Sequence, residues 1–293
     1  MEIPTVIKWA GGKKQLLEQF ENLYPDKFGN YYEPFLGSGA VFFQIRRKDL
    51  HRKSIYKEAE RKYFLSDSNS DLINLYKDVR DNVEKLISLL ETHKEKHHKD
   101  DDYFYKVRTD YNKGSKGLER SAQFIYLNKT CFNGLYRENS KGEFNVPKGS
   151  YKNPAIVNEK VLREASGLLQ GVYINCFLFQ KTEKLPQKGD FIYLDPPYYP
   201  LTETASFTSY TKLDFTGKDQ EKLAEYFRKL DEKGCLLMLS NSDTAFIKRL
   251  YEGFNISTVY ASRMINCQAE KRGKITEIVV RNYGSNNDEI VSL

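Results

Sequence analysis

The sequence predicts an α/β fold with a mostly parallel sheet, helices on both faces and an inserted segment. Three strand candidates are each followed by a helical pattern, and this alternation is typical of a parallel sheet. The last two strand candidates follow one another directly, so we expect an antiparallel edge. Between about Tyr76 and Gly171 the alternation stops, and the chain becomes charged, helical and rich in tyrosine.

The elements are expected in chain order. A first strand leads through a glycine turn into a helix, in the ranges Tyr31–Leu36, Gly37–Gly39 and Ala40–Arg46. A second strand ends at Asp67 and precedes a long helix, in the ranges Tyr63–Ser66 and about Ser70–His97. A third strand, Asp190–Leu194, ends at Asp195 and precedes a helix over about Lys218–Asp231. The remaining strands are expected at Leu236–Ser240, Ile256–Tyr260 and Ile275–Asn282.

Length and composition limit the class of protein. A chain of 293 residues suits one large α/β domain with an insertion, or two modest domains. The formal net charge of +6 favours a polyanionic partner, although many basic proteins bind no nucleic acid. No signal-peptide pattern and no apolar run long enough for a membrane span is present. We therefore expect a cytoplasmic protein that uses no membrane.

Cysteine and histidine offer little support for a metal site. The four cysteines, Cys131, Cys176, Cys235 and Cys267, form no CxxC pair, and we expect them to be reduced. His93, His97 and His98 lie among lysines and aspartates; they fit a metal site or a solvated helix end, and the hydrated neighbours favour the helix end. No metal is expected. Further along, Phe132–Pro147 predicts a β-hairpin that turns at Asn139–Gly142.

The segment Asp195-Pro196-Pro197-Tyr198 follows a hydrophobic strand. In open α/β sheets, ligand chemistry takes place at the carboxyl ends of strands. The carboxylate and the rigid carbonyl of Pro196 provide two acceptors for an exocyclic amino group, and the Tyr198 ring offers a face for a base to stack on. A proline-rich surface turn remains the alternative.

Glycines follow the first strand, in Glu33–Gly39. They allow a ligand close to the backbone and to the free N–H groups of the next helix. A GxGxxG fingerprint would need glycine where Phe42 stands, which disfavours a pyrophosphate and hence a nicotinamide oxidoreductase. Asp67 can accept bonds from ribose hydroxyls or cap the following helix. In the segment Lys8–Lys13, Trp9 lies beside two glycines and two lysines. This pattern fits a ligand with a carboxylate and an apolar face, and the alternative is a loop at a helix start that buries Trp9.

Together these motifs resemble the Dam family of DNA adenine-N6 methyltransferases. The matching segments occur in family order over nearly the whole chain, namely KWAGGK at Lys8–Lys13, EPFLGSG at Glu33–Gly39, SDSNSDLI at Ser66–Ile73, FNGLYR at Phe132–Arg137, GEFNVP at Gly142–Pro147, DPPY at Asp195–Tyr198 and RGKITEIVVRNY at Arg272–Tyr283. The resemblance implies a methyltransferase-type Rossmann fold. It also implies S-adenosylmethionine as methyl donor, S-adenosylhomocysteine as product, and double-stranded DNA as partner of a monomer associated with the bacterial nucleoid.

The resemblance also divides the chain and assigns residues. Residues 1–75 and 171–293 would form the catalytic domain, and residues 76–170 the target-recognition domain. The catalytic role falls on Asp195, Pro196, Pro197 and Tyr198. The cofactor-binding role falls on Trp9, Ala10, Gly11, Lys13, Phe35, Gly37, Ser38, Gly39, Asp67, Leu178, Phe179 and Asp195. Relatives in the family usually carry a carboxylate for the cofactor's adenine where this chain has Leu178, so either a main-chain group makes that contact or the affinity for adenine is weakened.

Target recognition is expected in the hairpin. The DNA-binding role falls on Lys8, Phe132, Asn133, Leu135, Arg137, Asn139 and Pro147. Arg137 suits bidentate contact with guanine, with a phosphate contact as the alternative, and Phe132 suits a wedge where the base leaves the stack. The hairpin's resemblance implies GATC as the target, in a restriction–modification or solitary role. Rival hypotheses are another target sequence, methylation of cytosine N4, RNA or protein glutamine, and an inactive nucleic-acid-binding relative.

Overall fold

The structure is a computed structural model that describes residues 2–55, 61–201, 215–261 and 275–284. The chain forms two compact units. The first comprises Met1–Gly12, Gly37–Glu58 and Asp67–Cys176, and the second comprises Lys13–Leu36, Ala59–Ser66 and Phe177–Leu293. Residues 76–170 all belong to the first unit, together with the glycine turn.

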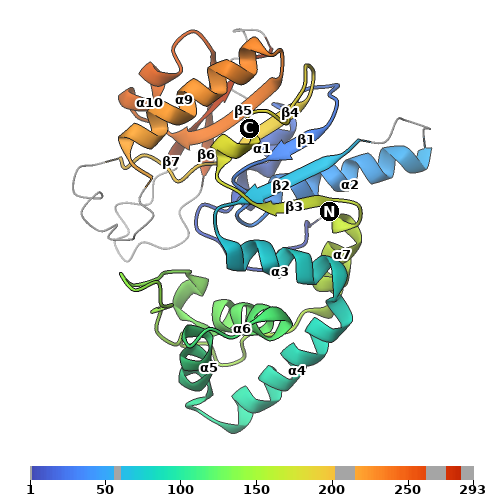
Figure 1. Ribbon diagram of the computed structural model, residues 1–293, viewed down its shortest axis with the longest axis vertical. Coiled ribbons are helices and arrows are strands. Elements are labelled where there is room, and N and C mark those ends of the chain that lie inside the picture. Colours follow the sequence, from blue (N-terminus) through green and yellow to red (C-terminus); the bar gives the residue numbers. More distant parts are fainter. Residues whose placement is uncertain (1, 56–60, 202–214, 262–274, 285–293) are drawn as a thin grey trace. The chain divides into compact units, whose positions relative to one another are not determined.

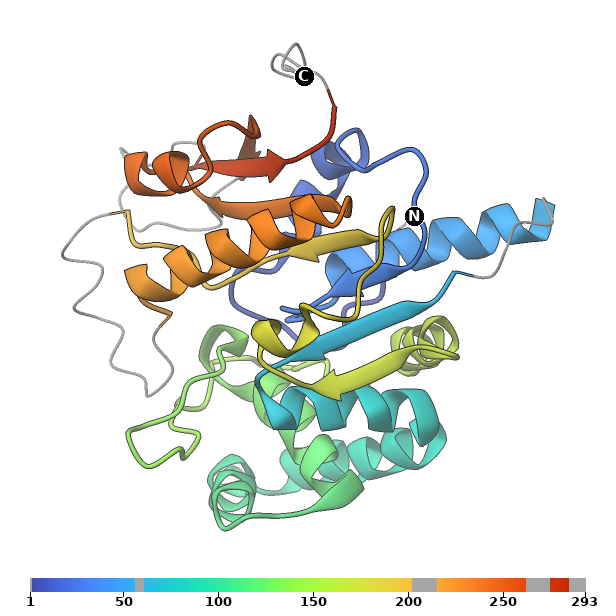
Figure 2. The same ribbon diagram turned by 45° about the horizontal axis from the view of Figure 1, so that its top comes forward.

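Seven strands of the described chain form one sheet, in the order β3-β2-β1-β4-β5-β7-β6 (Figure 2). β1 pairs in parallel with β2 and β4, β4 pairs in parallel with β5, and β7 is antiparallel to both β5 and β6. The predicted fold class is confirmed, with β7 inserted between β5 and β6. The strands are β1 Tyr31–Glu33, β2 Tyr63–Asp67, β3 Tyr173–Cys176, β4 Phe191–Leu194, β5 Leu236–Ser242, β6 Asn255–Ala261 and β7 Ile275–Arg281.

The described helices are α1 Leu17–Glu21, α2 Ala40–Ile55, α3 Ser70–Asp81, α4 Val83–Lys99, α5 Tyr103–Asn112, α6 Gly117–Thr130, α7 Glu159–Leu169, α9 Gly217–Glu232 and α10 Ala245–Leu250. Three short 3-10 helices are η1 Lys13–Leu16, η2 Phe132–Gly134 and η3 Phe179–Thr182. None of the helices in the described ranges combines the length and the apolar character needed to cross a bilayer.

The second unit is built around β4, whose four residues are all buried. Because side chains alternate along a strand, β4 supplies both faces of the sheet. Ile192 and Leu194 belong to the apolar core that α9 and α10 cover (Figure 1). Tyr193 points to the opposite face, where its ring lies 6.0 Å from Phe20 of α1. Each large apolar side chain buried in this way contributes about 2 kcal/mol, which keeps the end of β4 fixed.

The structure differs from the sequence-based prediction at two elements. The helix expected over Ser70–His97 is two helices, α3 and α4, which meet at Asn82. The Asn82 side chain bonds Asp78 at 3.2 Å, a local polar contact that competes with helix continuation, and no glycine or proline marks the break. The prediction also missed β3, because only Ile174 of its four residues is buried and no alternation signals a strand.

In the first unit, the helices α4, α5 and α6 lie together (Figure 1), and α6 also contacts α3. A polar network joins α3, α5 and α6. Arg120 donates to both oxygens of Asp71, at 2.6 and 2.7 Å, and the Tyr111 hydroxyl donates to the same carboxylate at 2.6 Å. The Asp71 side chain is only 13% exposed, so little water can solvate its charge. The three donated hydrogen bonds are therefore needed to offset the cost of burying this carboxylate.

Replacing Arg120 with methionine is expected to lower the free energy of unfolding by about 2 kcal/mol, because Asp71 loses its charged partner. Arg163→Met is the matched control, since Arg163 also binds a carboxylate of another helix, Glu84, but both side chains are about half exposed or more. Urea denaturation of both variants measures the difference. Equal stability loss in the two variants would contradict the role given to the Asp71 network.

Candidate active site

The predicted catalytic segment begins where β4 ends. The chain leaves β1 towards β2 and leaves β4 towards β5, so the neighbouring strands β1 and β4 flank the point where strand order reverses. Open α/β sheets bind ligands at the carboxyl ends of their strands at such a switch point. Asp195 follows Leu194, the last residue of β4. It therefore lies where this fold provides a ligand site.

A buried lysine holds the Asp195 carboxylate. The Lys13 side chain is 4% exposed, and its Nζ lies 2.8 Å from Asp195 Oδ1. The same ammonium lies 4.6 Å from the centroid of the Tyr198 ring, within the range of a cation–π interaction. The sequence assigns Lys13 to the cofactor, whereas in the structure it contacts the two outer members of the catalytic segment.

The pKa of Asp195 is raised to about 6, mainly because burial disfavours the charged carboxylate. Lys13 opposes this rise by charge and hydrogen bonding, and the negative charge of Glu277 adds to it. At neutral pH the carboxyl group is therefore mostly ionised and accepts hydrogen bonds. Below pH 6 it is mostly protonated and loses acceptor capacity.

Glu277 is a site residue to which the sequence assigned no role. The Tyr198 hydroxyl donates to Glu277 Oε2 at 2.6 Å. Burial raises the pKa of Tyr198 well above its usual value, so the phenol keeps the proton that it donates. The two residues lie 79 positions apart in the chain, and no motif spacing could have joined them. The only signal was that Glu277 belongs to the family-like segment Arg272–Tyr283.

The backbone on both sides of Tyr198 is held by two further residues that the sequence analysis missed. Gln220 of α9 donates to the carbonyl of Pro197 at 2.9 Å, and the N–H of Tyr199 donates to Asn241 at 3.2 Å. Asn241 also donates to Gln220 at 3.0 Å, and both amides are fully buried. Because one bond joins the two amides and each also bonds the backbone beside Tyr198, the pair forms a rigid support for the predicted catalytic segment.

Leu178 and Phe179, assigned to the cofactor's adenine, differ in exposure. Phe179 is buried, and its ring lies 5.3 Å from that of Phe35, which lies two positions before the glycine turn and was also assigned to the cofactor. Leu178 is 55% exposed and carries no charge. An exposed apolar side chain therefore precedes the buried Phe179 at the position where the resemblance leads us to expect a carboxylate.

In the first unit, the glycine turn forms a close backbone approach. Gly37 and Gly39 both have positive φ angles, 47° and 66°, which favour glycine. A Cβ on Gly37 would lie 2.9 Å from Trp9 Cδ1, so the indole packs directly against the turn. Ser38, between the glycines, is half-buried. Ala10 and Gly11 follow Trp9 and are exposed.

Asp67 supports the same turn. Its carboxylate accepts the N–H of Gly37 at 3.1 Å and that of Asn69 at 2.9 Å. The alternative that Asp67 caps helix α3 is wrong, because Asn69 is the N-cap and accepts from Leu72 at 2.9 Å. A carboxylate offers about four acceptor positions. Asp67 therefore retains capacity for a hydroxyl donor while it holds the turn.

Trp9 also contacts the predicted hairpin. Its ring stacks on Tyr136 with centroids 5.3 Å apart and planes 26° apart. Tyr136 lies between Leu135 and Arg137, and its hydroxyl donates to Glu138. The indole thus packs on the glycine turn and on a hairpin residue, a contact that the sequence analysis did not foresee.

The hairpin prediction is confirmed in its turn and pairing. Gly142 donates to the Asn139 carbonyl at 2.9 Å, and Glu138 pairs with Phe144. Its ladder is limited to isolated bridges, and the segment starts with the 3-10 helix η2. Of the seven assigned DNA-binding residues, six are exposed, namely Lys8, Phe132, Asn133, Leu135, Arg137 and Pro147.

Two of the DNA-binding assignments also have structural contacts. The Asn139 side chain accepts from the N–H groups of Lys141 and Glu143, so it organises the turn. Lys8 lies at the base of the hairpin, where its backbone exchanges two hydrogen bonds with Asn128, at 2.8 and 2.9 Å. The exposed Lys8 Nζ lies 5.2 Å from the centroid of the Tyr151 ring.

Of the three histidines on α4, two are more than a solvated helix end. His93 is buried, and its Nδ1 lies 2.8 Å from the Tyr103 hydroxyl, while His97 Nδ1 lies 2.8 Å from that of Tyr126. Only His98 is exposed. Burial lowers the pKa of His93 to about 4, so it is neutral at physiological pH. Within the described residues, no group of three or more metal-binding side chains occurs.

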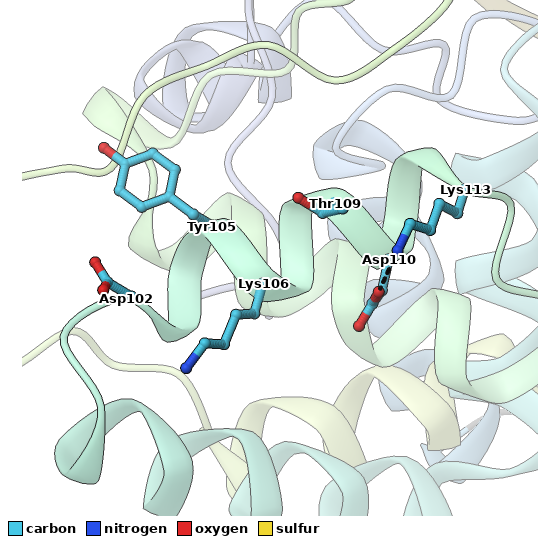
Figure 3. Close-up of a pocket in the computed structure, with 6 residues that line it drawn as sticks. All are labelled: Asp102, Tyr105, Lys106, Thr109, Asp110 and Lys113. Atoms are coloured by element: carbon cyan, nitrogen blue, oxygen red, sulfur yellow. Dashed lines mark ion pairs between the residues drawn. The ribbon is translucent and has the colours of Figure 1, made fainter.

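A separate hollow runs along α5 (Figure 3), but it contains none of the predicted site residues. Its polar lining includes an ion pair between Lys113 and Asp110 at 3.8 Å. The full lining is Asp102, Tyr105, Lys106, Thr109, Asp110 and Lys113. The candidate functional residues therefore lie at the strand end in the second unit and at the glycine turn in the first unit, and none of them lines this hollow.

Comparison with known proteins agrees with this geometry. Residues 9–265 match the model of the D12 class N6 adenine-specific DNA methyltransferases. The chain is 47% identical to the type II methyltransferase M.MjaIII of Methanocaldococcus jannaschii, over 97% of this chain and all of the relative. It is 42% identical to M1.LlaDCHI of Lactococcus lactis subsp. cremoris, over 95% of both chains. It is 32% identical to the DNA adenine methylase of Escherichia coli, over 93% of both chains.

The family match extends over both units, and it includes the catalytic segment at the end of β4 and the glycine turn before α2. Since the relatives are also covered over nearly their full length, the similarity is not limited to a shared nucleotide-binding core. The chain therefore belongs to the D12 class of N6 adenine-specific DNA methyltransferases.

Proposed function

We propose that this enzyme transfers a methyl group from S-adenosylmethionine to N6 of an adenine flipped out of double-stranded DNA, within the target GATC. The observation that carries the proposal is the segment Asp195–Tyr198, which provides a carboxylate, a rigid carbonyl and an aromatic ring at the switch point of the sheet. These three groups match an amino group with two hydrogens on a flat base.

The proposed chemistry follows from these residues. N6 is enclosed within the stack of a duplex, so the adenine must leave the helix. Its face then stacks on Tyr198, and its two N6 hydrogens are accepted by the Asp195 carboxylate and the Pro196 carbonyl. Both bonds concentrate the nitrogen lone pair for attack, so alignment and electrostatics lower the barrier. Asp195 need not act as a base before transfer, because the amine becomes acidic only after methylation.

The cofactor proposal relies on the first unit's glycine turn and on Asp67. S-adenosylmethionine supplies the methyl group when bound. The backbone at Gly37 and Gly39 has no side chain to block a ligand, and Asp67 retains acceptor capacity for ribose hydroxyls. The donor set therefore fits a nucleoside. Leu178 provides no acceptor for the cofactor's adenine amino group, so we assign that contact to main-chain groups.

The proposed target recognition relies on the exposed hairpin. Arg137 is exposed, and its Nε donates to Asn145 at 2.8 Å, which orients the guanidinium while its terminal nitrogens remain suited to guanine O6 and N7. Phe132 is 51% exposed, which is unusual for so large an apolar ring and fits a wedge between bases. The GATC assignment itself comes from the hairpin's resemblance to Dam-type enzymes.

Replacing Asp195 with alanine is expected to lower kcat about a hundredfold to a thousandfold, because one of the two N6 acceptors is lost. Transfer of labelled methyl groups to DNA measures the rate, and a DNA-binding assay controls for folding. If Asp195→Ala keeps near-normal turnover with unchanged DNA binding, the catalytic assignment is wrong.

Gly37→Ala is expected to weaken S-adenosylmethionine binding tenfold or more, since the new Cβ must displace Trp9 and strain a positive φ. Gly114→Ala is the matched control: its φ is 93°, but the added Cβ meets nothing within 4 Å. Calorimetric titration of both variants with S-adenosylmethionine measures their affinities. The comparison separates the effect of the new contact with Trp9 from the effect of backbone strain. Equal affinities of the two variants for S-adenosylmethionine would contradict the assignment of the glycine turn to the cofactor site.

Arg137→Ala is expected to reduce the preference for GATC over sequences altered at the guanine by about tenfold to a hundredfold. Lys141→Ala, which removes an exposed cation from the same hairpin, should weaken binding to all sequences alike. Competition binding with GATC and scrambled duplexes measures both effects. An equal loss on both duplexes for Arg137→Ala would assign it to a phosphate instead.

A further inference from the structure

We propose that Glu277 is a positioning residue for the methyl-transfer step: by accepting the Tyr198 hydroxyl hydrogen, it fixes the ring on which the target adenine stacks. This inference rests on the proposed function and adds a residue to that site. The contact that carries it is the hydrogen bond of 2.6 Å between Tyr198 and Glu277 Oε2. Charge-assisted bonds of this length are about twice as strong as neutral ones.

The acceptor is rigid because it belongs to a central strand and not to a loop. Glu277 lies on β7, which is hydrogen-bonded on both sides; its register partners are Ser242 on β5 and Val259 on β6. A side chain on such a strand holds its position better than one on a loop. The donor, by contrast, follows a proline turn at the end of β4.

Two side chains hold the hydroxyl end of Tyr198: the carboxylate of Glu277 and the neutral hydroxyl of Ser240, of which the carboxylate forms the stronger bond. The amides of Gln220 and Asn241 fix the backbone at Pro197 and Tyr199, and Lys13 lies over one face of the ring. None of these contacts holds the hydroxyl end. A stacking surface contributes to catalysis only when it is oriented before the base arrives, since ordering it later costs free energy.

The position of Glu277 also has a cost, which argues against a purely structural role. Its negative charge raises the pKa of Asp195, the carboxylate that must be ionised to accept N6 hydrogens. Lys13, Tyr193, Tyr198 and Glu277 are the titratable groups that act on Asp195 or respond to it. A neutral acceptor at this position would not raise the pKa of Asp195, but its hydrogen bond to Tyr198 would be weaker. The charge of Glu277 is therefore explained by the stronger bond that it forms with Tyr198.

The test is a double-mutant cycle with Glu277→Ala, Tyr198→Phe and the combined variant. Glu277→Ala should lower kcat about tenfold or more with DNA affinity changed less than twofold, and it should have little further effect once Tyr198→Phe has removed the hydroxyl. Thr276→Ala is the matched control: Thr276 is the neighbour on β7, and its side chain points to the opposite face. It should leave turnover unchanged.

Two further readouts separate positioning from folding. DNA with 2-aminopurine at the target adenine should show an altered fluorescence in the complex with Glu277→Ala, because the flipped base stacks on a mobile ring. Glu277→Gln keeps an acceptor oxygen without the charge and should recover only part of the kcat lost in Glu277→Ala, because the neutral bond to Tyr198 is weaker. It should also move the acidic limb of the kcat/KM profile to lower pH, since the charge that raises the pKa of Asp195 is gone.

Additive effects of Glu277→Ala and Tyr198→Phe, or full activity of either single variant, would overturn the proposal. If Glu277→Ala does not fold, Glu277→Gln and Tyr198→Phe decide alone: a fully active Tyr198→Phe enzyme would overturn it as well. Failure of the proposed function is a different result, in which the wild-type enzyme itself transfers no methyl group to adenine.

Discussion

The ion pair between Lys13 and Asp195 is the interaction on which the proposed catalytic segment Asp195–Tyr198 depends. In the proposed reaction, the Asp195 carboxylate at the end of β4 accepts hydrogens from an amine and must be ionised to do so, whereas burial favours its neutral form. Lys13, 2.8 Å away, opposes that effect, so Asp195 has a pKa of about 6 and not higher. The switch-point location and the core beneath β4 are useful because they hold this pair where a ligand arrives.

The remaining contacts of the site fix the residues that follow Asp195. Gln220 and Asn241 fix the backbone of the catalytic segment, and Glu277 fixes the hydroxyl end of the Tyr198 ring. In the first unit, Trp9 has a comparable linking role: it packs on Gly37 of the glycine turn and stacks on Tyr136 of the hairpin. Within the first unit, Trp9 therefore connects the glycine turn with the hairpin.

What the sequence could predict depended on how local each signal was. The strand before Asp195, the glycines at Gly37 and Gly39, and the turn of the hairpin are contiguous patterns, and the structure has them where they were expected. The Tyr198–Glu277 bond joins residues 79 positions apart, and the break at Asn82 has no glycine or proline. Contacts between distant elements follow from the sheet order, which no single segment encodes.

The central claim is that the catalytic segment methylates adenine at N6, and the most direct measurement is mass spectrometry of nucleosides from DNA treated with the purified enzyme and isotopically labelled S-adenosylmethionine. The account predicts labelled N6-methyladenine, and single-molecule sequencing of the same DNA should place it in GATC. Labelled N4-methylcytosine, or no labelled base while DNA is still bound, would contradict it. The first result would assign another acceptor, and the second would indicate an inactive binding protein.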